Sequence, residues 1–201
     1  MVDHAQASAH WDGIYSRPVE ELPWYSPQAD PELLVTLGAL LPPPARLLDI
    51  GCGPGTTAAD MGARGYDVLG VDISPKAIAA ATAHHGLAPR VRFCTADILL
   101  DDIPGAPFDG AIDRGAFGTL PPQARVAYVT RVAALLPRGA PLLLKVFSVD
   151  EPGEWGPHRF SPQQVRALFA GPFTVERIDD TVMPSTLDHD PRTLFVTLRR
   201  A

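Results

Sequence analysis

Glycines and an acidic residue gather directly after a short apolar run near residue 50. The segment Asp49-Ile50-Gly51-Cys52-Gly53-Pro54-Gly55-Thr56 has glycine at alternate positions, which lets the chain turn tightly and lets a ligand approach the backbone without meeting a Cβ. A dinucleotide fingerprint requires G-x-G-x-x-G, and numbering from Gly51 puts Thr56 where the third glycine belongs. The pattern predicts a ligand-binding loop and makes an NAD-dependent oxidoreductase the weakest interpretation.

Three carboxylates lie at the ends of three successive predicted strands. Asp49, two residues before Gly51, would repel a pyrophosphate and favour a cationic group such as an ammonium. Asp72 ends the next strand and is placed to accept hydrogen bonds from both ribose hydroxyls. Asp97, after the third strand, is placed to accept from an adenine amino group. Together they indicate a nucleoside that carries an amino-acid tail and no phosphates.

The strands that must position these residues are short apolar runs. The segment 141–147 is apolar except at Lys145, which is typical of a strand buried on both faces. The short segment 179–192 shows no helical periodicity, so it suits an antiparallel return better than a right-handed crossover. The predicted strands are 46–50, 66–72, 90–95, 108–113, 141–147, 173–178 and 193–198.

Capping residues and prolines mark the predicted helices. Asp30 and Ser74 each precede a proline at the first helical position, and Ser161 with Gln164 forms a capping box. The predicted helices are 30–41, 57–64, 74–84, 121–136 and 161–169. The fourth of these is expected to turn toward the core Val126, Val129, Val132, Ala133 and Leu136. Strands alternating with helices predict a Rossmann-like, doubly wound α/β sheet, mostly parallel with an antiparallel last strand.

Composition limits the kinds of protein that this chain can be. Its 201 residues are 46% hydrophobic and 20% charged, with a mean hydropathy of +0.04, which predicts one globular fold. Seventeen Lys and Arg against 23 Asp and Glu give a net charge of −6, so we expect no nucleic-acid partner. Two cysteines, Cys52 and Cys94, are too few for a metal cluster. The start of the chain lacks a secretory pattern, and we expect a cytoplasmic protein without a membrane partner.

Taken with these features, the sequence resembles the class I S-adenosylmethionine-dependent methyltransferases. The resemblance lies in Leu47–Thr56, Gly70–Ser74 and Thr95–Ile98. It implies that the glycine loop holds the methionine part of the cofactor, that Asp72 binds the ribose, and that Asp97 lies beside the adenine. The product would be S-adenosylhomocysteine. The expected cofactor-binding residues are Trp11, Tyr15, Trp24, Asp49, Gly51, Cys52, Gly53, Gly55, Thr56, Asp72, Ile73, Ala96, Asp97, Ile98 and Asp113.

Further motifs are similar to those of the thiopurine, thiol and halide methyltransferase group. They are His10–Tyr15, Leu22–Tyr25 and the Asp-Arg-Gly at 113–115. The group sometimes has tryptophan where this chain has Tyr15, and it has a polar residue where this chain has Tyr25. Aromatic side chains on a polar terminal segment need something to cover, so a lid over a ligand or a staple to the sheet would explain them. We expect one domain, with a lid segment and helix at 1–45 and the cofactor-binding part at 46–201.

Methyl transfer from a sulfonium is an in-line displacement that mainly needs alignment in a dry pocket. Asp113 and His158 are the candidate catalytic residues. His158 would orient or deprotonate the nucleophile, and Arg159 would pair with a substrate carboxylate, with hydrogen bonding inside the loop as the alternative for both. The expected acceptor-binding residues are Tyr25, Arg114, Phe117, Phe147, His158 and Arg159.

The small size of the chain favours a small-molecule acceptor, because there is no inserted substrate domain. A thiol is preferred, with nitrogen and oxygen acceptors as close competitors. Two alternatives keep the cofactor: a different S-adenosylmethionine chemistry such as cyclisation, and a non-catalytic cofactor-binding protein.

Overall fold

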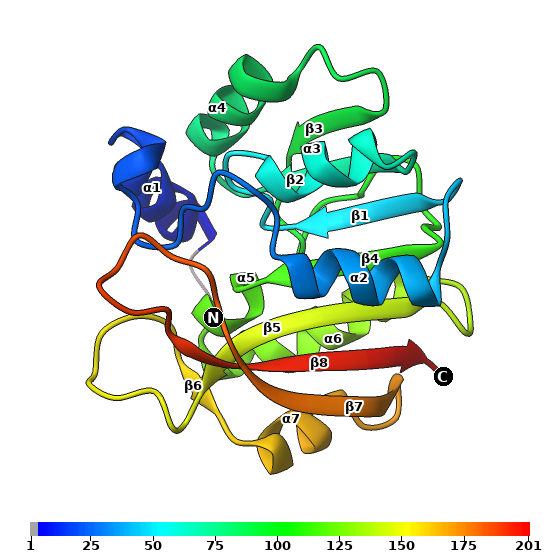
Figure 1. Ribbon diagram of the computed structural model, residues 1–201. Coiled ribbons are helices and arrows are strands. Elements are labelled where there is room, and N and C mark those ends of the chain that lie inside the picture. Colours follow the sequence, from blue (N-terminus) through cyan, green and yellow to red (C-terminus); the bar gives the residue numbers. More distant parts are fainter. Residues whose placement is uncertain (1–3) are drawn as a thin grey trace.

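An eight-stranded sheet runs through the centre of the protein (Figure 1). The computed structural model describes residues 4–201, so the first three residues of the predicted 1–45 segment lie outside the described part. The strand order is β3-β2-β1-β4-β5-β8-β7, and β6 pairs with β5. The strands are β1 (Arg46–Ile50), β2 (Asp67–Asp72), β3 (Val91–Thr95), β4 (Gly110–Arg114), β5 (Pro141–Ser148), β6 (Arg159–Phe160), β7 (Phe173–Val182) and β8 (Arg192–Arg200).

The predicted doubly wound sheet is confirmed, including its antiparallel last strand. Strands β1 to β5 pair in parallel, and β8 is antiparallel to both β5 and β7. In Figure 1 the arrowhead of β1 points toward α1, and that of β8 points the opposite way. The strand order reverses between β1 and β4, and ligands of such sheets bind beyond the carboxyl ends of the strands at this point.

Helices cover both faces of the sheet and enclose two cores. One core lies between the sheet and the helices α6 and α7, and the other between the sheet and α2 and α3. All of β5 is buried, as its largely apolar sequence predicted, and the ammonium of buried Lys145 pairs with Asp30 and Glu32. No helix within residues 4–201 is long and apolar enough to cross a membrane. The helices are α1 (His4–Ile14), η1 (Val19–Glu21, a 3-10 turn), α2 (Pro31–Leu40), α3 (Thr56–Ala63), α4 (Pro75–His85), α5 (Ala116–Thr119), α6 (Pro122–Leu135) and α7 (Pro162–Phe169).

The predicted helix starts are confirmed by their caps. The side chains of Asp30 and Ser74 accept hydrogen bonds from backbone N–H groups in the first turns of α2 and α4, and the capping box of Ser161 is present. For α6, the prediction that Val126 faces the core is wrong: Val126 is 67% exposed, whereas Tyr128 is fully buried. The buried face of α6 differs from the predicted one because the helix turns Tyr128 toward the core. A pattern that counts only aliphatic residues does not include this tyrosine.

Candidate active site

A large cavity opens where the parallel strands end. Its volume is about 1380 Å³, above the roughly 300–1,000 Å³ that is usual for one ligand, so it can hold two small molecules side by side. Residues of the glycine loop, the ends of the parallel strands and α1 line one part. The loop at 154–159 and the connection between β7 and β8 line another.

Most of the predicted site residues come together around this cavity. Those that line it are Trp11, Tyr15, Trp24, Tyr25, Asp49, Gly51, Cys52, Gly53, Thr56, Asp72, Ile73, Ala96, Asp97, Ile98, Arg114, Phe147, His158 and Arg159. Gly55, Asp113 and Phe117 do not line it, and this differs from the expectation that they contact a ligand.

The backbone of the glycine loop requires glycine at positions 51, 53 and 55. Gly51, Gly53 and Gly55 all have positive φ, which L side chains rarely adopt. A Cβ on Gly51 would overlap the Cβ of Ala116, and one on Gly53 would lie 2.7 Å from the hydroxyl of Tyr15. Gly55 precedes α3 and faces the core. The first two glycines therefore keep the loop close to α5 and to the N-terminal segment.

Asp49 is a buried carboxylate with an unsatisfied oxygen facing the cavity side of β1. Its Oδ2 atom has no hydrogen-bond partner among residues 4–201, and Asp49 lines the cavity. Burial, and then the charges of Asp113 and Asp72, raise the pKa of Asp49 to about 7. An ammonium group on a ligand would satisfy this oxygen and favour its ionised form. The site thus fits the amino-acid end of S-adenosylmethionine.

The other two predicted acids also lie at strand ends beside the cavity. Asp72 accepts hydrogen bonds from the backbone N–H of Gly53 (3.0 Å) and of Ser74 (2.9 Å), so it joins the glycine loop to the start of α4. Burial raises the pKa of Asp72, and these hydrogen bonds oppose the rise. Asp97 lies after β3, and its Oδ2 is 2.5 Å from Nδ1 of His4.

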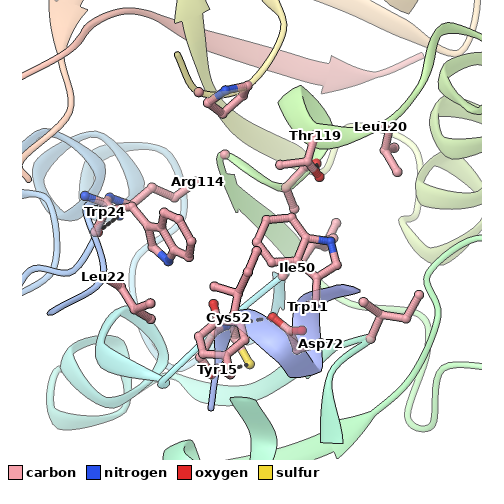
Figure 2. A pocket seen from close by; sticks show the side chains of 18 of the residues that line it. Trp11, Tyr15, Leu22, Trp24, Ile50, Cys52, Asp72, Arg114, Thr119 and Leu120 are labelled. Atoms are coloured by element: carbon pink, nitrogen blue, oxygen red, sulfur yellow. Dashed lines mark hydrogen bonds between the residues drawn. The ribbon is translucent and has the colours of Figure 1, made fainter. Parts of the chain in front are cut away.

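Helix α1 packs across the cofactor end of the cavity, where the sequence predicted a lid segment but no helix. Asp12 accepts hydrogen bonds from the Ser74 hydroxyl (2.5 Å) and the Lys76 backbone N–H (3.1 Å). The ring centroids of Trp11 and Trp24 are 5.9 Å apart. Figure 2 shows Trp11 beside Asp72 and Tyr15 beside Cys52. Helix α1 buries none of its residues, so it has no apolar stripe that would have indicated a helix.

Asp113 and Phe117 support the site from behind. Asp113 is fully buried and accepts hydrogen bonds from the Tyr128 hydroxyl (2.5 Å) and the Phe117 backbone N–H (2.9 Å). Burial raises its pKa to about 7, and these hydrogen bonds oppose the rise. The ring of Phe117 packs on that of Tyr128, with centroids 5.0 Å apart. The expectation of direct ligand contact is therefore corrected: Asp113 holds the start of α5.

The loop before β6 supplies the candidate base. The backbone N–H of His158 donates to the carbonyl of Gly118 (2.9 Å), which fixes the loop against α5. Burial, and then the charge of Arg125, lower the pKa of His158, which favours its neutral imidazole form. Arg159 donates to the carbonyls of Glu151 and Trp155, both at 3.0 Å, which is the bonding inside the loop that was the alternative to carboxylate binding.

Sequence reasoning missed the contribution of the connection between β7 and β8. Its residues Met183, Ser185, Leu187 and Pro191 line the cavity. The signal was available in the topology, because β7 runs antiparallel to β8 and therefore parallel to β5. The segment that follows β7 must then lie at the same edge of the sheet as the glycine loop.

The known proteins that this chain is similar to include methyltransferases. The family model described as thiopurine S-methyltransferase matches residues 6–200. A 2-heptyl-1-hydroxyquinolin-4(1H)-one methyltransferase of Mycobacteroides abscessus is 31% identical over 163 residues, which is 78% of this chain and 70% of that protein. A thiopurine S-methyltransferase of Pseudomonas entomophila is 32% identical over 161 residues, 72% of this chain and 74% of that protein.

Solved structures agree with this fold. The structure described as "Conversion of a Disulfide Bond into a Thioacetal Group during Echinomycin Biosynthesis" is 27% identical with a TM-score of 0.81, covering 96% of this chain and 92% of that one. Burkholderia thailandensis 1,6-didemethyltoxoflavin-N1-methyltransferase, with its substrate and S-adenosylhomocysteine bound, is 27% identical with a TM-score of 0.66, covering 98% and 83%.

Proposed function

The chain belongs to the thiopurine S-methyltransferase family and is an S-adenosylmethionine-dependent methyltransferase, and we propose that it methylates a heteroatom of a small molecule, with a thiol preferred over nitrogen or oxygen. One observation carries this proposal. The cavity has room beside the unsatisfied carboxylate of Asp49 for a second ligand. A small acceptor would lie there against the methyl donor.

On the cofactor side, each residue has a proposed binding role. When bound, the cofactor supplies a methyl group activated on a sulfonium. Asp49 would hold its ammonium, the glycine loop would approach its methionine part, and Asp72 would accept from the ribose hydroxyls. Asp97 would face the adenine. The aromatic rings of Trp11, Tyr15 and Trp24 would exclude water and favour the sulfonium charge. In this proposal the described part of the predicted 1–45 segment, residues 4–45, forms the lid segment and first helix, and 46–201 the cofactor-binding part.

On the acceptor side, the lining favours a flat and weakly polar molecule. Phe147, Trp155, Met183 and Leu187 present apolar surface there. Neutral His158 would take the proton of the nucleophile, or orient it, as the new bond to the methyl group forms. The activities for which the relatives are named support heteroatom acceptors on ring systems, since they include methylation of thiopurines and of a hydroxyquinolinone. The thiol preference follows the family to which the chain belongs.

The test is a product analysis with a panel of acceptors. The purified chain is incubated with S-adenosylmethionine and, separately, with an aromatic thiol, a phenol and a nitrogen heterocycle of similar size, and S-adenosylhomocysteine and the methylated product are measured by mass spectrometry. We expect one S-adenosylhomocysteine for each methylated thiol, and slower reaction with the other two. Methylation of only the phenol or heterocycle would contradict the thiol preference. An altered acceptor formed without S-adenosylhomocysteine would indicate another chemistry such as cyclisation.

A further inference from the structure

Two segments far apart in the sequence join directly over the acceptor side of the cavity. The backbone N–H of Thr186 donates to the carbonyl of Pro23 (3.0 Å), and its hydroxyl donates to the carbonyl of Leu22 (3.0 Å). Leu22 is almost fully buried. We call this junction of residues 22–24 with residues 184–186 the seam.

Arg114 lies beneath the seam and binds both of its sides. Its Nη1 donates to the carbonyl of Trp24 (3.2 Å), and its Nη2 donates to the carbonyl of Pro184 (2.6 Å). Figure 2 shows Arg114 next to Trp24, on the opposite side of the view from Leu120. A guanidinium is a rigid planar fork, so it can bridge two carbonyls at a fixed separation. Arg114 comes from the end of β4, directly after buried Asp113, so the fork is anchored to the sheet.

The N-terminal segment is attached to the rest of the fold at a second place. Around α1 and α4, Asp12 bonds Ser74 and the Lys76 backbone, and the hydroxyl of Ser8 donates to the carbonyl of Ile73 (3.0 Å). This attachment lies beside Asp72 at the cofactor end, whereas the seam involves the connection between β7 and β8. The two attachments use different residues and border different parts of the cavity.

We propose that Arg114 is a positioning residue that fixes the width of the acceptor subsite by holding residues 22–24 and 184–186 together, rather than a residue that binds the acceptor. The proposal rests on the proposed function for the meaning of the acceptor side. Two of the five N–H donors of Arg114 are committed to protein carbonyls, so the seam sets the orientation of its guanidinium. Acceptor affinity should therefore depend on the fork of Arg114 more strongly than does cofactor affinity, which the seam reaches through the ring of Trp24 beside Trp11.

The test compares Arg114→Lys with the unchanged protein. Lysine keeps the positive charge that interacts with Asp49 and Asp30 but has a single ammonium, which cannot bridge both carbonyls. We expect faster hydrogen exchange at the Thr186 amide, an acceptor KM raised about tenfold, little change in kcat, and an S-adenosylhomocysteine Kd within about twofold. Thr186→Val is the matched variant: it removes only the bond to Leu22, so its acceptor KM should rise about threefold.

Each outcome of this experiment supports or overturns the positioning role of Arg114. Unchanged exchange at Thr186 and an unchanged acceptor KM in folded Arg114→Lys would overturn the proposal, as would a cofactor Kd that rises as much as the acceptor KM. If Arg114→Lys does not fold, the same two readouts on Thr186→Val decide instead. If the unchanged protein methylates no acceptor, the proposed function fails, whereas the exchange and cofactor titration still show whether Arg114 holds the seam.

Discussion

The two ends of the cavity are built in different ways. The cofactor end is made of strand ends and of a short loop in which Gly51 and Gly53 are required by close neighbours. The acceptor end is made of three loops, and bonds such as that from Thr186 to Leu22 join residues 164 positions apart. Changes at the first end should therefore affect cofactor binding strongly, whereas changes at the second should affect the choice and handling of the acceptor.

The largest effect is expected at Gly51. Gly51→Ala places a Cβ on that of Ala116 and puts alanine at a φ of 65°, so the affinity for S-adenosylhomocysteine measured by calorimetry should fall by at least about 100-fold. Gly13→Ala is the control, because nothing lies within 4 Å of its Cβ position, and it should bind normally. Adding Ala116→Gly should recover part of the loss. Normal binding by Gly51→Ala would remove the steric basis of the comparison.

The next effect is expected at Asp72. In Asp72→Ala the loop amide of Gly53 and the amide of Ser74 lose their acceptor, and the proposed ribose contact is lost too. We expect cofactor affinity to fall about 30-fold in a folded protein. Thermal unfolding checks the fold. Asp72→Asn, which keeps one acceptor oxygen, should lose less. A folded Asp72→Ala with unchanged affinity would sink the ribose assignment.

The pH dependence of cofactor binding tests Asp49. Its pKa of about 7 in the ligand-free protein means that part of the population is protonated at pH 6 to 7. The ligand ammonium favours the ionised form, so binding releases a proton and tightens as the pH rises. Kd for S-adenosylhomocysteine should fall about tenfold from pH 6 to pH 8. Asp49→Asn removes this titration but leaves that of the ligand, so equal pH profiles for the two proteins would contradict the assignment.

The smallest effect is expected on the acceptor side, at His158. Because burial lowers its pKa below the usual 6.5, the imidazole is in its base form at pH 7 and gains a proton only at lower pH. His158→Gln should lower kcat about fivefold at pH 7, since thiols ionise near neutral pH and need little help. It should leave the cofactor Kd unchanged. A cofactor Kd that moved with kcat would show that the two ends are not separate.

The cofactor end could be predicted because its determinants are local. Strand ends carry Asp49, Asp72 and Asp97, and the glycines between them reveal the turn without any knowledge of distant residues. Helix caps such as Ser74 and Ser161 can likewise be recognised from a few neighbouring residues in the sequence. Parallel pairing of adjacent strands then brings these residues to one edge.

At the acceptor end most of the predicted residues line the cavity, but their contacts could not be predicted, because these depend on the finished topology. No residue near Arg114 in the sequence indicates that its guanidinium will donate hydrogen bonds to the carbonyls of Trp24 and Pro184. Asp113 has the residue type of a catalytic acid and the right strand end, but the helix after it brings Tyr128 and the Phe117 amide to its oxygens. In α6, helical spacing alone placed Val126 in the core, and the packing of Tyr128 leaves it exposed.

The place of β8 has a consequence for how the protein is made. A chain leaves the ribosome from its N-terminus, so the glycine loop and the five parallel strands emerge before β8, which must insert between β5 and β7. Until then β5 keeps an open edge, and unpaired edges invite association with other chains. During this interval the carbonyls of Leu22 and Pro23 also lack their hydrogen bonds from Thr186. We therefore expect the edge of β5 and the seam to be the last parts of the fold to be completed during synthesis.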